Sequence, residues 1–318
     1  MKKNLLILSF ILSPLVCKAQ AQAEAGFTVP DLPKSMEAAF TASDMQGSMR
    51  EGDKAAILMV HFGTTHDDTR LLTIEALNQK VKEQFENQEI REAYTSRLVI
   101  RRLKEKGLEK LTPMEALQKL KDDGFTHVTV QPTNIIEGVE MGVLRSEVSD
   151  MTDSFKDIRI GNPLLYTPKD YQDVIKALHP AGSRPSPDDR ATVWVGHGSY
   201  SPATAQYAML DYMLKAEGYD NCHVITVEGY PSLDEALAKI EKSGLKKVSL
   251  RPFLFVAGEH AKNDIGVEIK EALEDKGYQV ELFMEGLGQN ERIQAIFIDH
   301  IRFCFYYKMN NIKEKKND

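Results

Sequence analysis

A segment of twenty residues occurs twice in the chain, and this internal repeat restricts the possible folds more than any other feature. Residues 113–132 (PMEALQKLKDDGFTHVTVQP) align without a gap on residues 233–252 (LDEALAKIEKSGLKKVSLRP). Upstream, VHFGT at 60–64 resembles VGHGS at 195–199, since both contain a histidine and a glycine and end in a hydroxyl residue. Self-similarity of this length indicates a duplicated structural unit. We infer two similar lobes related by an approximate two-fold.

Each copy of the repeat lies within a run of strands that alternate with helices. Residues 55–63 form an apolar run ending in glycine, which predicts a buried strand, and Ile74, Leu77 and Val81 then share one helical face. The same pattern predicts strands near 90–94, 126–132, 191–198, 223–229 and 246–253, and helices over 98–104, 114–121, 171–178, 203–216 and 233–242. Such alternation is typical of parallel sheets covered on both faces. The predicted fold class is therefore α/β, with two lobes that each contain a parallel sheet flanked by helices.

Composition divides the chain into five segments. The stretch HPAGSRPSPDDR at 179–190 combines proline, glycine, serine and charge, as connections between domains do. The residues before the first strand are rich in Ala, Ser and Met and are only weakly periodic. The predicted segments are a signal peptide (1–22), a leader (23–52), an N-terminal lobe (53–185), a C-terminal lobe with the metal site (186–303) and a charged tail (304–318).

The N-terminus has the pattern of a secretory signal peptide. Two lysines precede an apolar run of twelve residues from Leu5 to Val16, and small and polar residues follow. The run is shorter than the roughly 20 residues that a transmembrane helix needs. Cys17 leaves lipoprotein anchoring open, although the bulky Val16 before it argues against lipid attachment. We expect an exported, periplasmic protein with no transmembrane segment in the mature chain.

Charge and cysteine content exclude several classes of function. The formal net charge of -7 becomes -10 without the first 22 residues, which contain three lysines and no acidic residue, and this argues against a nucleic-acid partner. Cys222 and Cys304 remain in the mature chain, and the sequence leaves open whether they pair. The chain has no G-x-x-x-x-G-K-[ST] loop, so nothing indicates a nucleotide.

Three side chains that can bind a metal follow three successive strands predicted in the second lobe. They are His197 after ATVWVG, Glu228 after HVITV, and His260 in the loop after KKVSLRPF. Ligands of parallel sheets bind beyond the carboxyl ends of the strands. Two imidazoles and one carboxylate suit Co, Fe, Ni or Zn and leave positions open for a substrate. A single histidine at such a position is more often a hydrogen-bonded loop residue, but three such side chains at equivalent strand ends favour a metal site.

The first lobe does not carry the same set of side chains, since Glu140 stands at the position that matches His260. We therefore predict that the second lobe binds the metal and that the first lobe contributes to the substrate side of the cleft. Four polar residues of the first lobe are assigned to substrate binding: His61, Thr64, Asn134 and Glu140.

Six motifs extend this interpretation to a family. They are VHFGTTHDDTR (60–70), YTSRLVIRRL (94–103), TVQPTNIIEGVE (129–140), GHGSYSPATAQYAML (196–210), TVEGYPSLDEAL (226–237) and RPFLFVAGEHAKND (251–264). In order and spacing they resemble the anaerobic cobaltochelatases that act on sirohydrochlorin in cobalamin biosynthesis, over about residues 54 to 301. The resemblance implies a two-lobed, self-associating chelatase in which His197, Glu228 and His260 bind the incoming ion.

The implied reaction inserts a divalent ion into a tetrapyrrole without ATP, with Co²⁺ expected and Fe²⁺ or Ni²⁺ as alternatives. Insertion removes two pyrrole protons, and His197 or His260 could accept one because histidine titrates near neutrality. Arg70, Arg97 and Arg251 are candidates for binding substrate carboxylates, although a surface or salt-bridge role is equally open for each.

Export is in tension with a biosynthetic role, because sirohydrochlorin is made in the cytoplasm. Two alternatives therefore stay open. One is a periplasmic carrier of a tetrapyrrole or a metal that performs no turnover. The other is a dechelatase that removes iron from haem.

Overall fold

The computed structural model describes residues 32, 34–179, 189–258 and 261–310. The expected signal peptide with Cys17, most of the predicted connection and the predicted ligand His260 lie outside these residues.

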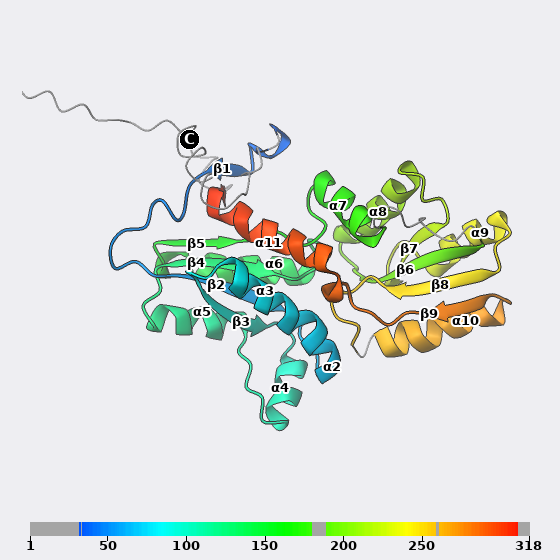
Figure 1. Cartoon of the computed structure of the whole chain (residues 1–318), viewed down its shortest axis with the longest axis horizontal. Coiled ribbons are helices and arrows are strands. Elements are labelled where there is room, and N and C mark those ends of the chain that lie inside the picture. Colours follow the sequence, from blue (N-terminus) through cyan, green and yellow to red (C-terminus); the bar gives the residue numbers. More distant parts are fainter. Residues whose placement is uncertain (1–31, 33, 180–188, 259–260, 311–318) are drawn as a thin grey trace, which may run out of the picture.

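Two parallel sheets of four strands form the framework of the molecule (Figure 1). The first has the order β3-β2-β4-β5 and the second the order β7-β6-β8-β9, so their topologies are identical. The strands of the first sheet are β2 (Ala55–His61), β3 (Glu89–Tyr94), β4 (His127–Pro132) and β5 (Asp157–Ile160). Those of the second are β6 (Arg190–Gly198), β7 (Cys222–Glu228), β8 (Lys247–Pro252) and β9 (Gln279–Leu282). The α/β fold with two similar lobes is confirmed.

Helices cover both sheets. The N-terminal half of the chain contributes α2 (Asp67–Arg70), which continues through a π-helical turn (Leu71–Glu75) into α3 (Ala76–Gln84), then α4 (Arg97–Glu105), α5 (Pro113–Asp122), α6 (Val139–Asp150) and α7 (Pro168–Leu178). The C-terminal half contributes α8 (Ala205–Ala216), which lies beside α7, then α9 (Leu233–Ser243), a π-helical segment (Ala261–Ile269) that leads into α10 (Lys270–Asp275), and α11 (Glu291–Tyr306). None of the described helices is both long and apolar enough to cross a membrane.

The duplicated sequence builds the same local structure twice. Thr112 and Glu115 form a capping box at the start of α5, in which the Thr112 amide donates to the Glu115 carboxylate at 2.8 Å. Ser232 and Glu235 form the matching box at the start of α9, also at 2.8 Å. A capping box satisfies amide groups that the first helical turn leaves without intrahelical partners. The glutamate that both copies of the repeat share therefore helps to fix where these two helices begin.

The inner faces of the two sheets share one apolar core. Met59 of β2 and Trp194 of β6 belong to the same buried cluster, together with Phe253, Phe255 and Phe297. Separate clusters fill the space between the outer face of each sheet and its own helices. Since burial of a large aromatic side chain stabilises a fold by a few kcal/mol, we infer that the two lobes are held together by this common core.

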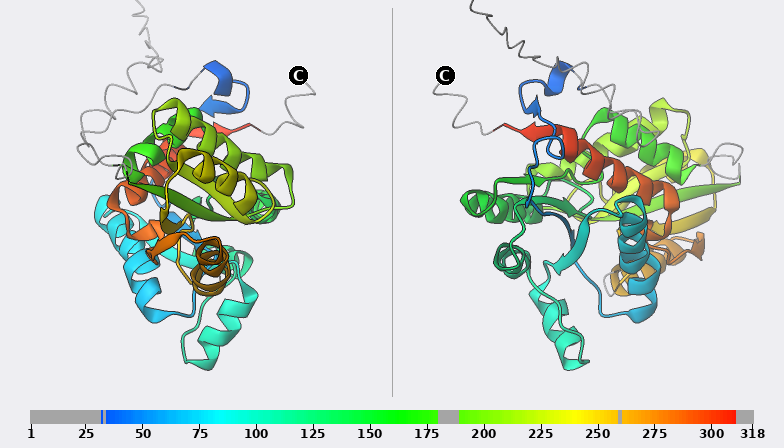
Figure 2. Two further views of the ribbon diagram at one scale, coloured as in Figure 1. Left: turned by 90° about the vertical axis from the view of Figure 1, so that its right-hand side faces the viewer. Right: turned by 60° about the vertical axis from the view of Figure 1, so that its left-hand side comes forward.

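The last helix crosses back from the second lobe to the first. Helix α11 packs on α7 and β4, and the strand after it, β10 (Tyr307–Met309), pairs antiparallel with β1 (Phe40–Ala42) (Figure 2). The predicted tail at 304–318 therefore begins with structured residues, because the apolar face of α11 continues through Phe305, which is buried. Part of the predicted leader likewise belongs to the folded body.

The two cysteines of the described residues are buried thiols that form no disulfide with one another. Cys222 begins β7 in the second lobe, whereas Cys304 lies near the end of α11. Burial raises the pKa of Cys222 to about 11. Both are therefore structural residues of the core.

Candidate functional site between the lobes

A cavity of about 550 Å³ opens between the lobes at the carboxyl ends of the strands. Its walls come from the loop after β2, the start of α4, the loop between β4 and α6, the ends of β6 and β7, and the loop after β8. This is the position at which parallel sheets bind ligands. Most of the surface that lines the cavity is apolar, with a few polar groups that converge on it.

His197 and Glu228 reach the cavity from neighbouring strands. Gly198, which follows the histidine, lies opposite Glu228 in the parallel pairing of β6 and β7. Gly198 has a φ of 90°, and a Cβ atom there would come within 1.6 Å of the Glu228 carbonyl oxygen. Glycine is therefore required, because only glycine combines a positive φ with so close an approach. The predicted pair of side chains is brought together at one edge of the sheet.

The other glycine of the GHG sequence makes room for an aromatic wall. A Cβ atom on Gly196 would lie 2.3 Å from Cε1 of Tyr207, a side chain of α8 that lines the cavity. Burial raises the pKa of Tyr207 to about 12, so its phenol stays protonated across the physiological range. Both glycines on either side of His197 thus serve close packing at the site.

Glu140 lies across the cavity from this pair, in the first turn of α6. Asn134 Nδ2 donates a hydrogen bond to Glu140 Oε2 at 3.2 Å. Desolvation raises the pKa of Glu140 above its ordinary value, against the opposing effects of the Asn134 hydrogen bond and the charge of His197. Glu140 is consequently a better proton acceptor than a carboxylate of ordinary pKa, and the charge of His197 acts on it.

Thr64 lies where loops of the two lobes meet at the cavity. Its side-chain oxygen accepts a hydrogen bond from the amide of His66 at 3.2 Å, and a Cβ atom on Gly258 would lie 3.2 Å from it. His66 Nδ1 in turn lies 3.1 Å from Lys262 Nζ. The loop after β2 is therefore in contact with the segment that carries the predicted ligand His260.

His61 lies behind the cavity wall and does not line it. The side chain is 1% exposed, with Nδ1 3.1 Å from Thr133 Oγ1 and Nε2 3.0 Å from Asn78 Oδ1. Burial lowers its pKa to about 4. The geometry differs from the substrate contact expected for His61 and makes it a neutral residue that positions Thr133, which does line the cavity.

Of the three predicted metal ligands, the structure brings two to the cavity. His260 lies outside the described residues, although Gly258, two positions earlier, lines the same cavity. Within the described part of the chain, no three His, Cys, Asp or Glu side chains stand close enough to hold a metal ion. The complete ligand set therefore stays a prediction from the sequence.

Sequence reasoning missed one wall of the cavity, which helix α4 supplies through Leu98, Val99 and Arg102. The three apolar residues followed by two arginines in LVIRR were the available signal. The arginines that the sequence suggested for substrate carboxylates, Arg70, Arg97 and Arg251, do not line the cavity. Arg70 is paired with Asp67 at 2.6 Å and Glu75 at 2.9 Å, and the Arg251 guanidinium lies 3.6 Å from the ring centre of Phe283.

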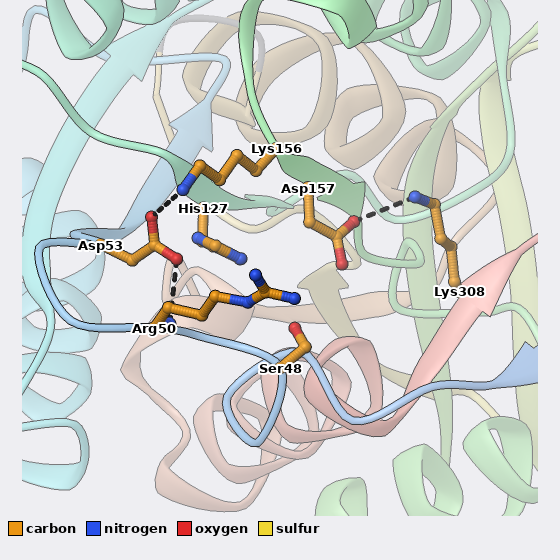
Figure 3. Close-up of a pocket in the computed structure, with 7 residues that line it drawn as sticks. All are labelled: Ser48, Arg50, Asp53, His127, Lys156, Asp157 and Lys308. Atoms are coloured by element: carbon orange, nitrogen blue, oxygen red, sulfur yellow. Dashed lines mark hydrogen bonds and ion pairs between the residues drawn. The ribbon is translucent and has the colours of Figure 1, made fainter.

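A second cavity, of about 370 Å³, lies at the opposite end of the first sheet (Figure 3). Its charged side chains are largely paired with one another, with Lys156 2.7 Å from Asp53 and Lys308 3.1 Å from Asp157. These pairs connect the segment before β2 and strand β10 to the sheet. The charged residues of this second cavity are therefore explained by their role in holding these two segments against the first sheet.

Three comparisons agree with this geometry. The family described as "Cobalt chelatase (CbiK)" matches residues 55–305. The sirohydrochlorin cobaltochelatase of Salmonella typhimurium is 34% identical over 256 residues, which cover 78% of this chain and 95% of that protein. The sirohydrochlorin cobaltochelatase CbiKC of Nitratidesulfovibrio vulgaris is 32% identical over 257 residues, covering 78% and 89%. SirB from Bacillus subtilis with Fe³⁺ shares the fold, with a TM-score of 0.57 at 16% identity over 78% of this chain and 94% of that one.

Proposed function

The chain belongs to the cobalt chelatase (CbiK) family, and from this premise we propose that it inserts Co²⁺ into sirohydrochlorin in the cavity between its lobes. One observation carries the proposal. His197 and Glu228 end neighbouring strands and face a largely apolar cavity, with Glu140 on the opposite wall. The arrangement offers metal-binding side chains at a place that a planar, apolar macrocycle can enter.

Cobalt is the substrate in this scheme, held by His197, Glu228 and His260 before it passes to the ring. An imidazole and a carboxylate bind a borderline divalent ion without saturating it, so positions remain for the pyrrole nitrogens. Fe²⁺ and Ni²⁺ would bind the same donors, and we propose Co²⁺ because the two relatives are cobaltochelatases.

Two pyrrole N–H protons leave the ring as one divalent ion enters, so the charge of the ring is unchanged and no electron is transferred. His197 is one proton acceptor, as soon as it has released the metal. Glu140, whose pKa desolvation raises, is suited to be the other. The reaction requires no nucleotide, because metal–nitrogen bond formation and proton release supply the driving force.

Turnover under anaerobic conditions distinguishes this proposal from its alternatives. Purified protein at a tenth of the sirohydrochlorin concentration should convert all of the substrate to the cobalt complex, which absorbance spectra follow. Binding of one equivalent without conversion would instead identify a carrier. Release of free porphyrin from added haem would identify a dechelatase.

We further propose that the N-terminal residues direct export to the periplasm and that the mature chain self-associates. Both follow from the sequence and the family resemblance. Fractionation of cells tests the first, since a processed chain in the cytoplasmic fraction would contradict it. Sedimentation equilibrium tests the second, and a monomer at micromolar concentration would contradict it.

A further inference from the structure

Helix α4 projects from the first lobe (Figures 1 and 2), and some of its residues line the cavity. Ser96 caps its start by accepting a hydrogen bond from the Val99 amide at 3.3 Å, and Leu103 is the one buried residue of the helix. Lys106 Nζ donates to the Thr65 carbonyl oxygen at 2.8 Å, which ties the end of α4 to a loop of the cavity wall. The helix is thus fixed at both ends while most of its surface stays exposed.

The face of α4 that borders the cavity combines apolar and basic character. Leu98, Val99 and Arg102 line the cavity, and Leu98 is 47% exposed. Helix positions three and four residues apart lie on one face, so the arginine stands directly beside the apolar pair. An apolar surface next to a guanidinium matches a macrocycle that carries carboxylates at its rim.

Arg102 is the only lysine or arginine among the described residues that line this cavity. The other charged groups there are Glu140 and Glu228, together with the histidines. The cavity therefore combines one arginine, on α4, with two glutamates and the side chains of His66 and His197.

Arg102 also differs from Arg70 and Arg145 in having no carboxylate partner among the described residues. Arg70 is paired with Asp67 at 2.6 Å, and Arg145 with Glu137 at 2.5 Å. For Arg102 the described residues provide no hydrogen bond or ion pair, and the side chain is exposed. Its helix adds further basic residues in a chain whose net charge is -7: Arg97, Arg101 and Lys104.

We propose that Arg102 binds a peripheral carboxylate of the tetrapyrrole and thereby sets the orientation of the ring in the cavity, with Leu98 and Val99 against its face. The inference rests on the proposed function and names the substrate contact that the function needs. A guanidinium binds a carboxylate through two parallel hydrogen bonds, which fixes direction as well as position. The substrates selected are tetrapyrroles that carry acidic side chains.

Titration of metal-free sirohydrochlorin tests the contact without relying on turnover. Fluorescence of the ligand should give a Kd that rises roughly tenfold in Arg102→Ala and partly recovers in Arg102→Lys, as expected for one partly screened charge-assisted pair. KM should rise in parallel while kcat stays within about twofold. Arg101→Ala is the matched control, because Arg101 lies on the same helix but does not line the cavity, and its Kd should be unchanged.

A second ligand separates a specific contact from general loss of structure. Sirohydrochlorin with esterified carboxylates should bind the wild-type chain more weakly, and Arg102→Ala should then have no further effect, as in a double-mutant cycle. The inference is overturned if Arg102→Ala leaves the Kd of sirohydrochlorin unchanged, or if it weakens binding of the ester equally. A wild-type chain that binds sirohydrochlorin through Arg102 but inserts no Co²⁺ would overturn the proposed function and leave this contact supported.

Discussion

The backbone of Gly198 lies against that of Glu228, so closely that a Cβ atom on the glycine would come within 1.6 Å of the glutamate carbonyl oxygen. The contact is set by the pairing of β6 with β7, in which these residues stand opposite one another. It places the two predicted ligands, His197 and Glu228, at adjacent strand ends. The spacing of the site therefore depends on a residue that has no side chain.

Gly198→Ala should disrupt both the fold and the site. The positive φ of 90° strains any L-residue, and the added methyl group must push β6 away from β7. We expect the free energy of unfolding to fall by about 2–4 kcal/mol and activity to fall at least tenfold. Denaturant titration and the insertion assay measure the two effects.

Gly218→Ala is the matched control for that variant. Gly218 has a φ of 86°, but no atom lies within 4 Å of its Cβ position. The substitution should cost only about 1 kcal/mol of backbone strain. Equal losses in the two variants would show that the contact with Glu228 is unimportant.

The chain should lose stability in acid because of His61. Burial lowers the pKa of His61 to about 4, against about 6.5 in the unfolded chain. As the pH falls from 6.5 towards 4, the unfolded state binds a proton that the native state does not, so native stability falls by up to about 3 kcal/mol. His61→Gln should therefore show a shallower decline of unfolding free energy over this interval. Parallel pH curves for the two proteins would contradict the assignment.

Gln206 of α8 connects the lobes beside the cavity. Its Oε1 accepts a hydrogen bond from the Glu137 amide at 2.8 Å, and its Nε2 donates to the Leu165 carbonyl oxygen. Gln206→Ala leaves both groups without this partner and should cost about 1–3 kcal/mol of unfolding free energy. Gln118→Ala, on the exposed face of α5, should change it by less than about 0.5 kcal/mol. Similar effects of the two substitutions would refute the bridging role.

Arg159 fastens the end of α11 to the first sheet. Its guanidinium is buried and donates to the carbonyl oxygens of Ser43 at 2.8 Å and Cys304 at 2.7 Å, beside the carboxylate of Asp157. Arg159→Met removes the donor to these two carbonyl oxygens and one of the two cations beside Asp157, so thermal or chemical denaturation should report a loss of about 2–4 kcal/mol. Arg292→Met, at the surface, serves as the control and should be near neutral.

Elements with strong local signals could be predicted from the sequence. The apolar strands and the helices of the repeat can be predicted because the apolar periodicity of neighbouring residues shows which face of each element is buried. Strands β5 (DIRI) and β9 (QVEL) were missed because edge strands of four residues are too short for a clear apolar alternation. The return of α11 to the first lobe was also missed, because it depends on contacts with distant elements.

The residues of the candidate site likewise fall into those that local sequence signals predict and those that depend on tertiary packing. His197 and Glu228 could be placed at one edge because the ends of parallel strands coincide. Arg102 could not, since the position of α4 over the cavity follows from tertiary packing. The sequence also indicates why Arg70 is not available to a substrate, because Asp67 stands three residues earlier and can neutralise it.

The most direct test of the central claim is the rate of Co²⁺ insertion into sirohydrochlorin by the wild-type chain, His197→Ala and Glu228→Gln. His127→Gln, which changes a histidine of the other cavity, is the control. Loss of a metal ligand should lower the catalysed rate by more than the roughly 10- to 100-fold typical of losing an outer-shell partner. We predict that the first two variants fall to the spontaneous rate while the control retains wild-type activity. Insertion by His197→Ala at the wild-type rate would contradict the account.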